Sequence, residues 1–365
     1  MKPSITILYA YRNRDARRVK LSLLSLQQQT TQGFEVVFVD YGSEAAYAQA
    51  VEEVVNTFDF TSYHYVGHPG LLWNKSKALN YGIRRAKGDY VFIADVDVLF
   101  HPETMHLFQN IAHQKTAYLF HLSYLSQKVT ELLDTETNFF ELPMKHTGAV
   151  NGMVLTSIKS LFDIHGVDEF FHFYGSEDVD LFQRLEFAGQ QLVQRPEKYF
   201  LHQWHTIYNS YDDSKLSITP RLYNIKRINQ QHYFYHKATA SVKPNHSEAW
   251  GQVVKSSDLE QLQHPDEVYQ ISNHHAKVIH FLKVVLPAFK NGVLKLEVRD
   301  DDYRHSFKYK LKKFLKKESQ PYSSIKDVND LILSEIIYNY RDHNYLYEVH
   351  KDLKGVTFSI QKDKR

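Results

Sequence analysis

Two carboxylates separated by one residue, Asp95-Val96-Asp97, directly follow a run of apolar residues at positions 90–94. Carboxylate oxygens bind divalent cations, and such a cation neutralises a diphosphate and stabilises its departure as a leaving group. One carboxylate of the pair can hold the metal while the other accepts a hydrogen bond from a sugar or ribose hydroxyl. Asp-x-Asp triplets also occur by chance, so the position after an apolar segment is the stronger part of this signal.

A second acidic group, Glu177-Asp178-Val179-Asp180, follows Ser176 at the start of a predicted helix. Ser176 is a typical N-cap residue and the helix dipole favours carboxylates in the first turn, so a capped helix start explains the pattern without catalysis. A carboxylate kept ionised at a helix N-terminus can also act as a general base toward a hydroxyl group. On that interpretation, Asp178 is the base and Glu177 binds the acceptor.

The third group contains two histidines, in His202-Gln203-Trp204-His205. The chain has 21 His, so the pair can be accidental, and a half-buried His with a hydrogen-bond partner is the structural alternative. Neutral imidazole nevertheless binds Mn²⁺-type ions alongside carboxylates. If Asp97 supplies one ligand, we predict His205 as another.

Alternating strand and helix patterns position these groups. We predict strands over 5–10, 34–39, 63–66 and 90–94, helices over 15–29, 44–58 and 74–85 between them, and further on helices at 102–112, 157–162 and 177–187 and a strand at 116–124. Such alternation is typical of βαβ units around a parallel sheet. Ligands of open α/β sheets bind beyond the carboxyl ends of the strands, so Asp40 and the Asp95/Asp97 pair are expected at one edge.

The length of 365 residues suits two domains, and 43% hydrophobic residues support a buried core. We predict a catalytic domain at 1–240, a linker within 238–264, and an α+β accessory domain at 250–365 that orients the acceptor or mediates assembly. The balance of 44 Lys+Arg against 42 Asp+Glu argues against a nucleic-acid binder. The absence of Cys excludes disulfides, thiolate metal sites and Cys nucleophiles, and fits a reducing cytosol.

Two segments bear on membranes. The apolar run at 5–8 lacks the length of a signal sequence or a membrane span. The basic segment 308–317 carries apolar residues at Leu311, Phe314 and Leu315. A solvated helix face accounts for this segment, and contact with an anionic membrane surface is the alternative.

The order of motifs resembles the inverting GT-A glycosyltransferases of the family 2 type, in the branch with the β-galactosyltransferases, the polypeptide N-acetylgalactosaminyltransferases and the chondroitin polymerases. The motifs that carry the resemblance, over residues 4 to about 230, are Tyr11 to Arg14, Asp40-Tyr41-Gly42-Ser43, Asn74 to Gly82, Asp95-Val96-Asp97, Glu177 to Asp180, and His205. Two departures stand out. Tyr41 replaces the second Asp of the usual Asp-Asp-Gly-Ser, and Phe171 to Tyr174 replaces a Trp-Gly-Trp-Gly run.

The resemblance implies a GT-A fold, Rossmann-like with a mostly parallel sheet and flanking helices. It implies a Mn²⁺- or Mg²⁺-dependent enzyme that moves a hexose or N-acetylhexosamine from a UDP-sugar to a hydroxyl of a glycan, free or lipid-linked. The expected setting is bacterial surface polysaccharide or lipopolysaccharide synthesis, in the cytoplasm or at the inner face of the plasma membrane.

The same resemblance implies roles for individual residues. Asp178 is the implied general base with Glu177 beside it, and the implied metal ligands are Asp97 and His205, with His202 as a further candidate. The implied donor-binding residues are Tyr11, Arg12, Arg14, Asp40, Lys77, Asn80, Asp95, Val96 and Gly152, the last in a small-residue turn at 147–153.

Two alternatives remain. A protein that binds nucleotide sugars or carbohydrates without turnover would have no physical reason to keep a base beside a metal site. A nucleotidyltransferase would need a Gly-rich phosphate loop after the first strand, and residues 9–14 contain no Gly.

Overall fold

The computed structural model describes residues 4–134, 137–149, 151–206, 212–245, 249–315, 317 and 321–362. The chain forms two compact units. Unit 1 contains residues 1–67, 73–210 and 226–253, and unit 2 contains residues 68–72, 211–225 and 254–365. The last crossing between the units, at 253–254, falls within the predicted linker at 238–264. The short segments 68–72 and 211–225 also belong to unit 2. A division of the chain at one position in the sequence would have left both of them in the first domain.

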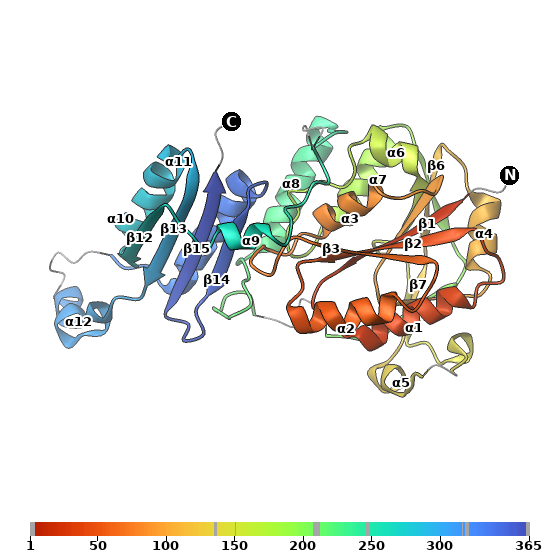
Figure 1. Cartoon of the computed structure of the whole chain (residues 1–365), viewed down its shortest axis with the longest axis horizontal. Helices are drawn as coiled ribbons and strands as arrows, with labels where there is room; N and C mark the ends of the chain where they lie inside the picture. Colours follow the sequence, from red (N-terminus) through yellow and green to blue (C-terminus); the bar gives the residue numbers. More distant parts are fainter. Residues whose placement is uncertain are drawn as a thin grey trace. The chain divides into compact units, whose positions relative to one another are not determined.

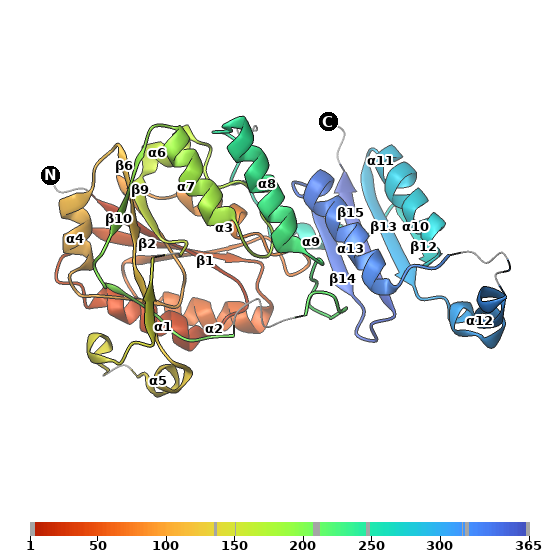
Figure 2. The same cartoon turned by 180° about the vertical axis from the view of Figure 1, so that it is seen from behind.

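Unit 1 is an α/β domain. Its elements are β1 (Ile5–Tyr11), α1 (Ala16–Gln27), β2 (Phe34–Tyr41), α2 (Ala45–Val55), β3 (Thr61–Val66), α3 (Lys75–Ile83), β4 (Tyr90–Ala94), β5 (Val98–Phe100), α4 (Thr104–Ile111), β6 (Thr116–Phe120), β7 (Leu122–Tyr124), α5 (Gln127–Leu132), β8 (His146–Gly148), β9 (Val154–Ser157), α6 (Ile158–Asp163), α7 (Glu177–Phe187), β10 (Gln191–Arg195), β11 (Phe200–His202) and α8 (Ile225–Thr239). Figures 1 and 2 show α1 and α2 on one face of the central sheet, with α3, α6 and α7 on the other.

The central sheet has seven strands in the order β10-β6-β9-β4-β1-β2-β3. Strands β3, β2, β1 and β4 are parallel, and β9 runs antiparallel to its neighbours β4 and β6. A second sheet has the order β5-β11-β7-β8. The predicted single strand at 116–124 is wrong in this respect, because the chain leaves the central sheet after β6 and enters the second sheet with β7.

An aromatic cluster fixes the end of β4. The ring of Phe92 lies 4.7 Å from Phe108, 5.3 Å from Phe200, 5.6 Å from Phe120 and 5.9 Å from Phe100, measured between centroids. Each ring is fully buried, and burial of a Phe side chain contributes about 1.5–3 kcal/mol. The cluster joins β4, β5, α4, β6 and β11, so it holds together the strands that flank the Asp95-Val96-Asp97 triplet.

Unit 2 is an α+β domain. It contains α9 (Asp258–Gln261), β12 (Glu267–Ser272), α10 (His275–His280), a π-helical turn at Phe281–Val285, α11 (Leu286–Ala288), β13 (Gly292–Arg299), α12 (Phe307–Phe314), α13 (Ile325–Glu335), a second π-helical turn at Ile336–Tyr340, β14 (Tyr345–Val349) and β15 (Gly355–Lys362). The sheet order is β12-β13-β15-β14. Figure 2 shows α10, α11 and α13 over one face of this sheet. Among the residues that the structure describes, no helix combines the length and apolarity that crossing a bilayer requires.

Candidate active site

The pairing of β11 with β5 brings the two histidines to Asp97. These strands are antiparallel, with His202 opposite Val98, and the Gln203 N–H donates to the Asp97 carbonyl at 3.1 Å. As a result, His205 Nε2 lies 3.2 Å from Asp97 Oδ2 and His202 Nε2 lies 3.5 Å from Asp97 Oδ1. One short β ladder thus brings together the three residues that the two separate motifs predicted as metal ligands.

The three side chains fit a divalent cation. Asp97 Oδ1 is buried and accepts no hydrogen bond from the described part of the chain. His205 Nδ1 donates to the Thr206 carbonyl at 2.9 Å, which in the neutral ring leaves the Nε2 lone pair directed at Asp97. One ligand atom from each of Asp97, His202 and His205 lies within 4.8 Å of the others. A carboxylate with two imidazoles suits a Mn²⁺-type ion.

Lys75 is a site residue that the sequence motifs did not single out. Its Nζ lies 2.6 Å from Asp95 Oδ1, and the charge of Lys75 lowers the pKa of Asp95 in spite of burial. Burial alone would lower the pKa of Lys75, but the charges of Asp95, Glu177 and Asp178 raise it overall. Lys75 therefore connects Asp95 electrostatically with Glu177 and Asp178 of α7.

The sequence pattern predicted Lys77 rather than Lys75 from the same motif. Asn74 caps α3 by accepting a hydrogen bond from the Lys77 N–H at 2.8 Å. Residues two positions apart on a helix point about 200° apart, so only one of the two lysines can face the strand ends. Lys77 is 6% exposed, whereas Lys75 reaches Asp95. The sequence signal that could have pointed to Lys75 was its position directly after Asn74, the N-cap residue of α3.

The α7 start differs from the predicted cap. Ser176 occupies the N-cap position, but its backbone is left-handed with φ of 73° and its side chain forms no capping hydrogen bond. The alternative of a helix start capped by the Ser176 side chain is therefore not realised, since a capping Ser normally has an extended backbone. Instead, Glu177 Oε2 accepts from the Gly175 N–H at 3.1 Å and Asp178 Oδ1 accepts from the Val179 N–H at 2.8 Å.

Glu177 and Asp178 lie close enough to influence each other. Burial raises the pKa of Glu177, Lys75 opposes this shift, and the charge of Asp178 adds to it. Both carboxylates are half-buried. The pair therefore combines a carboxyl group whose pKa is raised with a second carboxylate in the same half-buried surroundings.

The small-residue turn lies beside Asp178. A Cβ added at Gly152 would sit 3.6 Å from Asp178 Cβ and 3.8 Å from its Oδ2. Asn151 fixes the turn, since its Nδ2 donates to the Phe120 carbonyl at 2.7 Å and its Oδ1 accepts from the Met153 N–H at 3.0 Å. Position 150 of the predicted turn lies outside the described residues. The fold thus places Gly152 and Asp178 side by side although they are distant in sequence.

Hydrogen bonds join the two loops predicted to hold the nucleoside. Asp40 is fully buried, accepts from the Ser43 N–H and the Tyr63 hydroxyl at 3.0 Å each, and has a pKa raised by burial. The Asn13 N–H, in the preceding loop, donates to Ser43 Oγ at 2.9 Å. Asn13 has φ of 47°, a left-handed backbone of the kind that collects at functional sites.

The other residues predicted to bind the sugar donor differ in whether their side chains are buried or exposed. Tyr11 and Val96 belong to the buried core, and the Tyr11 hydroxyl donates to the Arg14 carbonyl at 2.6 Å, so these two residues offer a ligand mainly their backbone. The Arg14 side chain is exposed. Arg12 is half-buried, and its charge lowers the pKa of Asp40 against the larger effect of burial.

Asn80 is fully engaged within the protein. Its Nδ2 donates to the Val167 carbonyl at 2.7 Å and to Glu169 Oε1 at 2.9 Å, and its Oδ1 accepts from the Val167 N–H at 2.7 Å. The side chain is 0% exposed. A donor contact through the Asn80 side chain would require these bonds to break.

A second cluster of metal-ligand type lies in unit 1, at Asp168, His232 and His236. His232 Nε2 is 2.7 Å from Asp168 Oδ2, and His236 Nδ1 is 2.8 Å from Asp180 Oδ1. Arg184 Nε binds the other Asp180 oxygen at 2.7 Å. Asp180, from the acidic motif, therefore belongs to this buried network and not to the group around Asp97.

The network holds α8 against the loop that leads into α7. On the same helix, Asn229 Nδ2 donates to the carbonyls of His172 and Tyr174 at 3.1 Å each. The segment from 172 to 176 contains two non-glycine residues with a left-handed backbone, Phe173 and Ser176, and Gly175 also has a positive φ. These contacts hold the loop in its strained backbone conformation, and the loop in turn positions the carboxylates that follow it.

Asp168→Ala is expected to lower the free energy of unfolding of unit 1 by about 3–5 kcal/mol, because breaking one side of a buried ion pair leaves the partner uncompensated. Urea denaturation followed by far-UV circular dichroism measures the change. The matched control is Asp163→Ala, which removes the exposed Lys159–Asp163 pair and should cost less than about 1 kcal/mol. Equal losses of unfolding free energy in both variants would show that the buried network contributes no more stability than an exposed ion pair.

Comparison with known families gives two matches within unit 1. Residues 6–160 match the family described as glycosyl transferase family 2, and residues 132–209 match the family described as the N-terminal domain of galactosyltransferase. The part of unit 1 from residue 6 to residue 209 therefore carries matches to two glycosyltransferase families. The first match spans Asp40 and Asp97 and the second spans Asp178 and His205, so the predicted resemblance and the predicted GT-A type of α/β fold are both confirmed.

Solved structures of glycosyltransferases align with part of this chain. The mannosyltransferase PcManGT from Pyrobaculum calidifontis, in complex with GDP-Man and Mn²⁺, is 19% identical over 66% of this chain and 64% of its own, with a TM-score of 0.44. TarS 1-349 from S. aureus, in complex with UDP-GlcNAc, is 16% identical over 57% of this chain and 61% of its own, with a TM-score of 0.41. The aligned part spans less than two thirds of each of these chains. A search of curated protein sequences found no match.

Proposed function

We propose that unit 1 transfers a hexose or N-acetylhexosamine from a UDP-sugar to a hydroxyl group of a glycan, with inversion at the anomeric carbon. The observation that carries this proposal is the joint presence of a metal-type site around Asp97 and a carboxylate pair at α7, with Lys75 interacting electrostatically with that pair and with Asp95. The match to glycosyl transferase family 2 supports it. The acceptor we propose is a surface glycan, and unit 2 is proposed to orient it.

On the donor side, the proposed nucleoside site lies between the loop at 11–14 and the loop at 40–43. Asp95, whose ionised form Lys75 stabilises, accepts hydrogen bonds from donor hydroxyl groups. A divalent cation held by Asp97, His202 and His205 would supply positive charge beside the diphosphate leaving group.

On the acceptor side, Asp178 takes the proton of the attacking hydroxyl group. The acceptor oxygen forms a bond to the anomeric carbon while the bond from that carbon to the diphosphate oxygen breaks, and the electron pair leaves with UDP. One such displacement inverts the anomeric configuration. Glu177 binds a neighbouring acceptor hydroxyl, and the Tyr174 ring, 45% exposed, offers a face for stacking with a sugar.

A UDP-sugar together with Mn²⁺ is expected to raise the midpoint of thermal unfolding. At about 100 times Kd a ligand stabilises the native state by about 2.7 kcal/mol, which for a domain of this size corresponds to about 5–10 °C. Differential scanning fluorimetry with UDP-, GDP- and CMP-sugars, each with Mn²⁺ or with EDTA, measures the shift. The proposal fails if no sugar nucleotide gives a Mn²⁺-dependent shift.

Turnover separates the enzyme from the binding-protein alternative. Release of UDP in the presence of a mixed glycan acceptor pool supports transfer, and a shift without any UDP release supports a binding protein. A thermal shift with GDP- or CMP-sugars but not with UDP-sugars would support the same class of reaction with a different nucleotide in the donor.

A further inference from the structure

Helix α12 turns an apolar face away from unit 2, the unit to which it belongs. Phe307 is 79% exposed and Phe314 82%, with Leu311 at 43% and Leu315, directly after the helix, at 52%. The spacing of these residues, i, i+4, i+7 and i+8, places them on one side of a helix. In the described part of the chain, α12 has no buried residue. The stripe therefore faces solvent instead of a core.

Aromatic contacts of Tyr309 join α12 to the rest of unit 2. The Tyr309 ring lies 5.2 Å from Tyr322 and 5.8 Å from Tyr303 between centroids, and the Tyr322 hydroxyl donates to Asp301 Oδ2 at 3.0 Å. At about 100° per residue, Tyr309 points 140–200° away from Phe307, Leu311 and Phe314. Figures 1 and 2 show α12 standing apart from the sheet of unit 2. The anchoring side and the apolar side of the helix are thus opposite.

Positive charges flank the apolar stripe. They are Lys308, Lys310, Lys312, Lys313 and Lys317. No ion pair with a carboxylate is found for these five lysines in the described ranges around α12. Lys316 of the predicted basic segment 308–317 lies outside the described residues. The helix thus combines an outward apolar face with unneutralised lysines on both sides of it.

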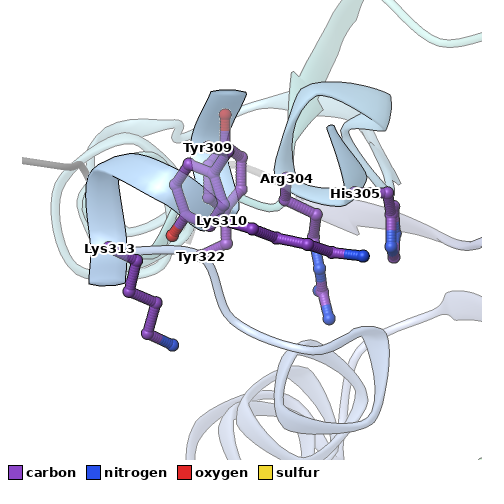
Figure 3. Close-up of a pocket in the computed structure, with 6 residues that line it drawn as sticks. All are labelled: Arg304, His305, Tyr309, Lys310, Lys313 and Tyr322. Atoms are coloured by element: carbon purple, nitrogen blue, oxygen red, sulfur yellow. The ribbon is translucent and has the colours of Figure 1, made fainter. Parts of the chain in front are cut away.

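A cavity of about 300 Å³ opens beside the helix (Figure 3). It is lined by Arg304, His305, Tyr309, Lys310, Lys313 and Tyr322. Asp300 pairs with Arg304 at 3.2 Å and with His305 at 2.7 Å, which leaves the two lysine ammonium groups to act on a ligand. Figure 3 shows the Tyr309 and Tyr322 rings between Lys313 and Arg304. Ammonium groups around a cavity of this size suit a phosphate group carried by a larger molecule.

We infer that α12 binds the surface of an anionic phospholipid bilayer. Phe307 and Phe314 insert at the level of the headgroups, the flanking lysines attract the anionic surface, and a headgroup phosphate occupies the cavity. A nucleic acid would satisfy the lysines but offers no apolar medium for the Phe and Leu side chains. A second copy of this chain, with a net charge of +2, has no excess of negative charge to offer. The inference does not depend on the proposed sugar transfer.

Vesicle co-sedimentation of the full chain tests the inference. We expect binding to vesicles of phosphatidylcholine with about one third phosphatidylglycerol, loss of that binding at high ionic strength, and no binding to phosphatidylcholine alone. Lys310→Gln combined with Lys313→Gln should weaken binding about 30-fold, because each lysine near an anionic surface contributes about fivefold. Phe307→Ser combined with Phe314→Ser should abolish it.

The control is Lys351→Gln combined with Lys354→Gln, which removes the same charge from the exposed β14–β15 turn of unit 2 and should bind vesicles like the unmodified chain. All variants change exposed side chains, and an unchanged thermal midpoint confirms that each is folded. Equal binding to neutral and anionic vesicles, or equal loss in the control, overturns the inference. The inference is also overturned if the chain binds inorganic phosphate or nucleic acid but no vesicle. It is overturned as well if the Phe variants only convert a dimer into a monomer.

Discussion

Asp178→Asn is expected to lower kcat by about 10²–10⁴-fold, the range that a general base contributes. Asn has the size of Asp and can still accept the Val179 N–H bond seen at 2.8 Å, but it cannot take a proton from the acceptor. The affinity for the sugar nucleotide should stay nearly unchanged. Initial rates of UDP release, together with calorimetric titration of the donor, separate the two quantities.

Glu177→Gln is the comparison variant for this prediction. Gln keeps a hydrogen-bonding side chain at the acceptor position, so we expect a higher KM for the acceptor and a much smaller loss of kcat. If Asp178→Asn retains near-normal turnover while Glu177→Gln loses it, the two roles must be exchanged. If both variants turn over normally, neither carboxylate is the base.

Asp97→Ala is expected to weaken the binding of Mn²⁺ by about 100-fold or more, since ligation of a metal is worth several kcal/mol. Asp97 is the only carboxylate of its cluster, and the two remaining imidazoles carry no negative charge to neutralise the ion. Donor affinity measured with Mn²⁺ should fall in parallel. Calorimetric titration of Mn²⁺, and then of the UDP-sugar, gives both constants.

Two variants make this result specific. Asp95→Asn should keep Mn²⁺ binding and lose donor affinity, because Asp95 pairs with Lys75 rather than with the histidines. Asp168→Asn probes the second Asp–His–His cluster and should leave Mn²⁺ affinity unchanged. If Asp168→Asn loses Mn²⁺ binding while Asp97→Ala keeps it, the ion binds at the Asp168 cluster and our assignment to Asp97 is wrong.

The strands that carry the site were predictable because they are buried in a parallel sheet. The predicted strand at 90–94 has the bounds of β4, and the predicted strand at 5–10 differs from β1 by one residue. Strands covered on both faces are continuous apolar runs, which a single sequence displays directly. The neighbouring polar residues at 40, 95 and 97 could therefore be assigned to one edge of the sheet.

The short strands and α8 were not predictable in the same way. β5 and β11 have three residues each, too few to show a period of two, and they exist because they pair with each other. α8 has a polar and aromatic sequence, IKRINQQHYFYHKAT, whose His and Asn residues find partners only in distant loops. The strand predicted at 116–124 crosses between two sheets for the same reason, since the choice of partner strand is a tertiary contact.

The sequence by itself determined the chemistry available to this protein: carboxylates after β4 and at α7, a histidine pair, and the order of motifs that resembles the GT-A glycosyltransferases. Tertiary structure decided which of these groups meet. The β5–β11 ladder brings His202 and His205 to Asp97, the phase of α3 selects Lys75 over Lys77, and burial assigns Asn80 and Asp180 to structural networks. Residue type fixes what a side chain can do, whereas its partners depend on long-range packing that no local pattern encodes.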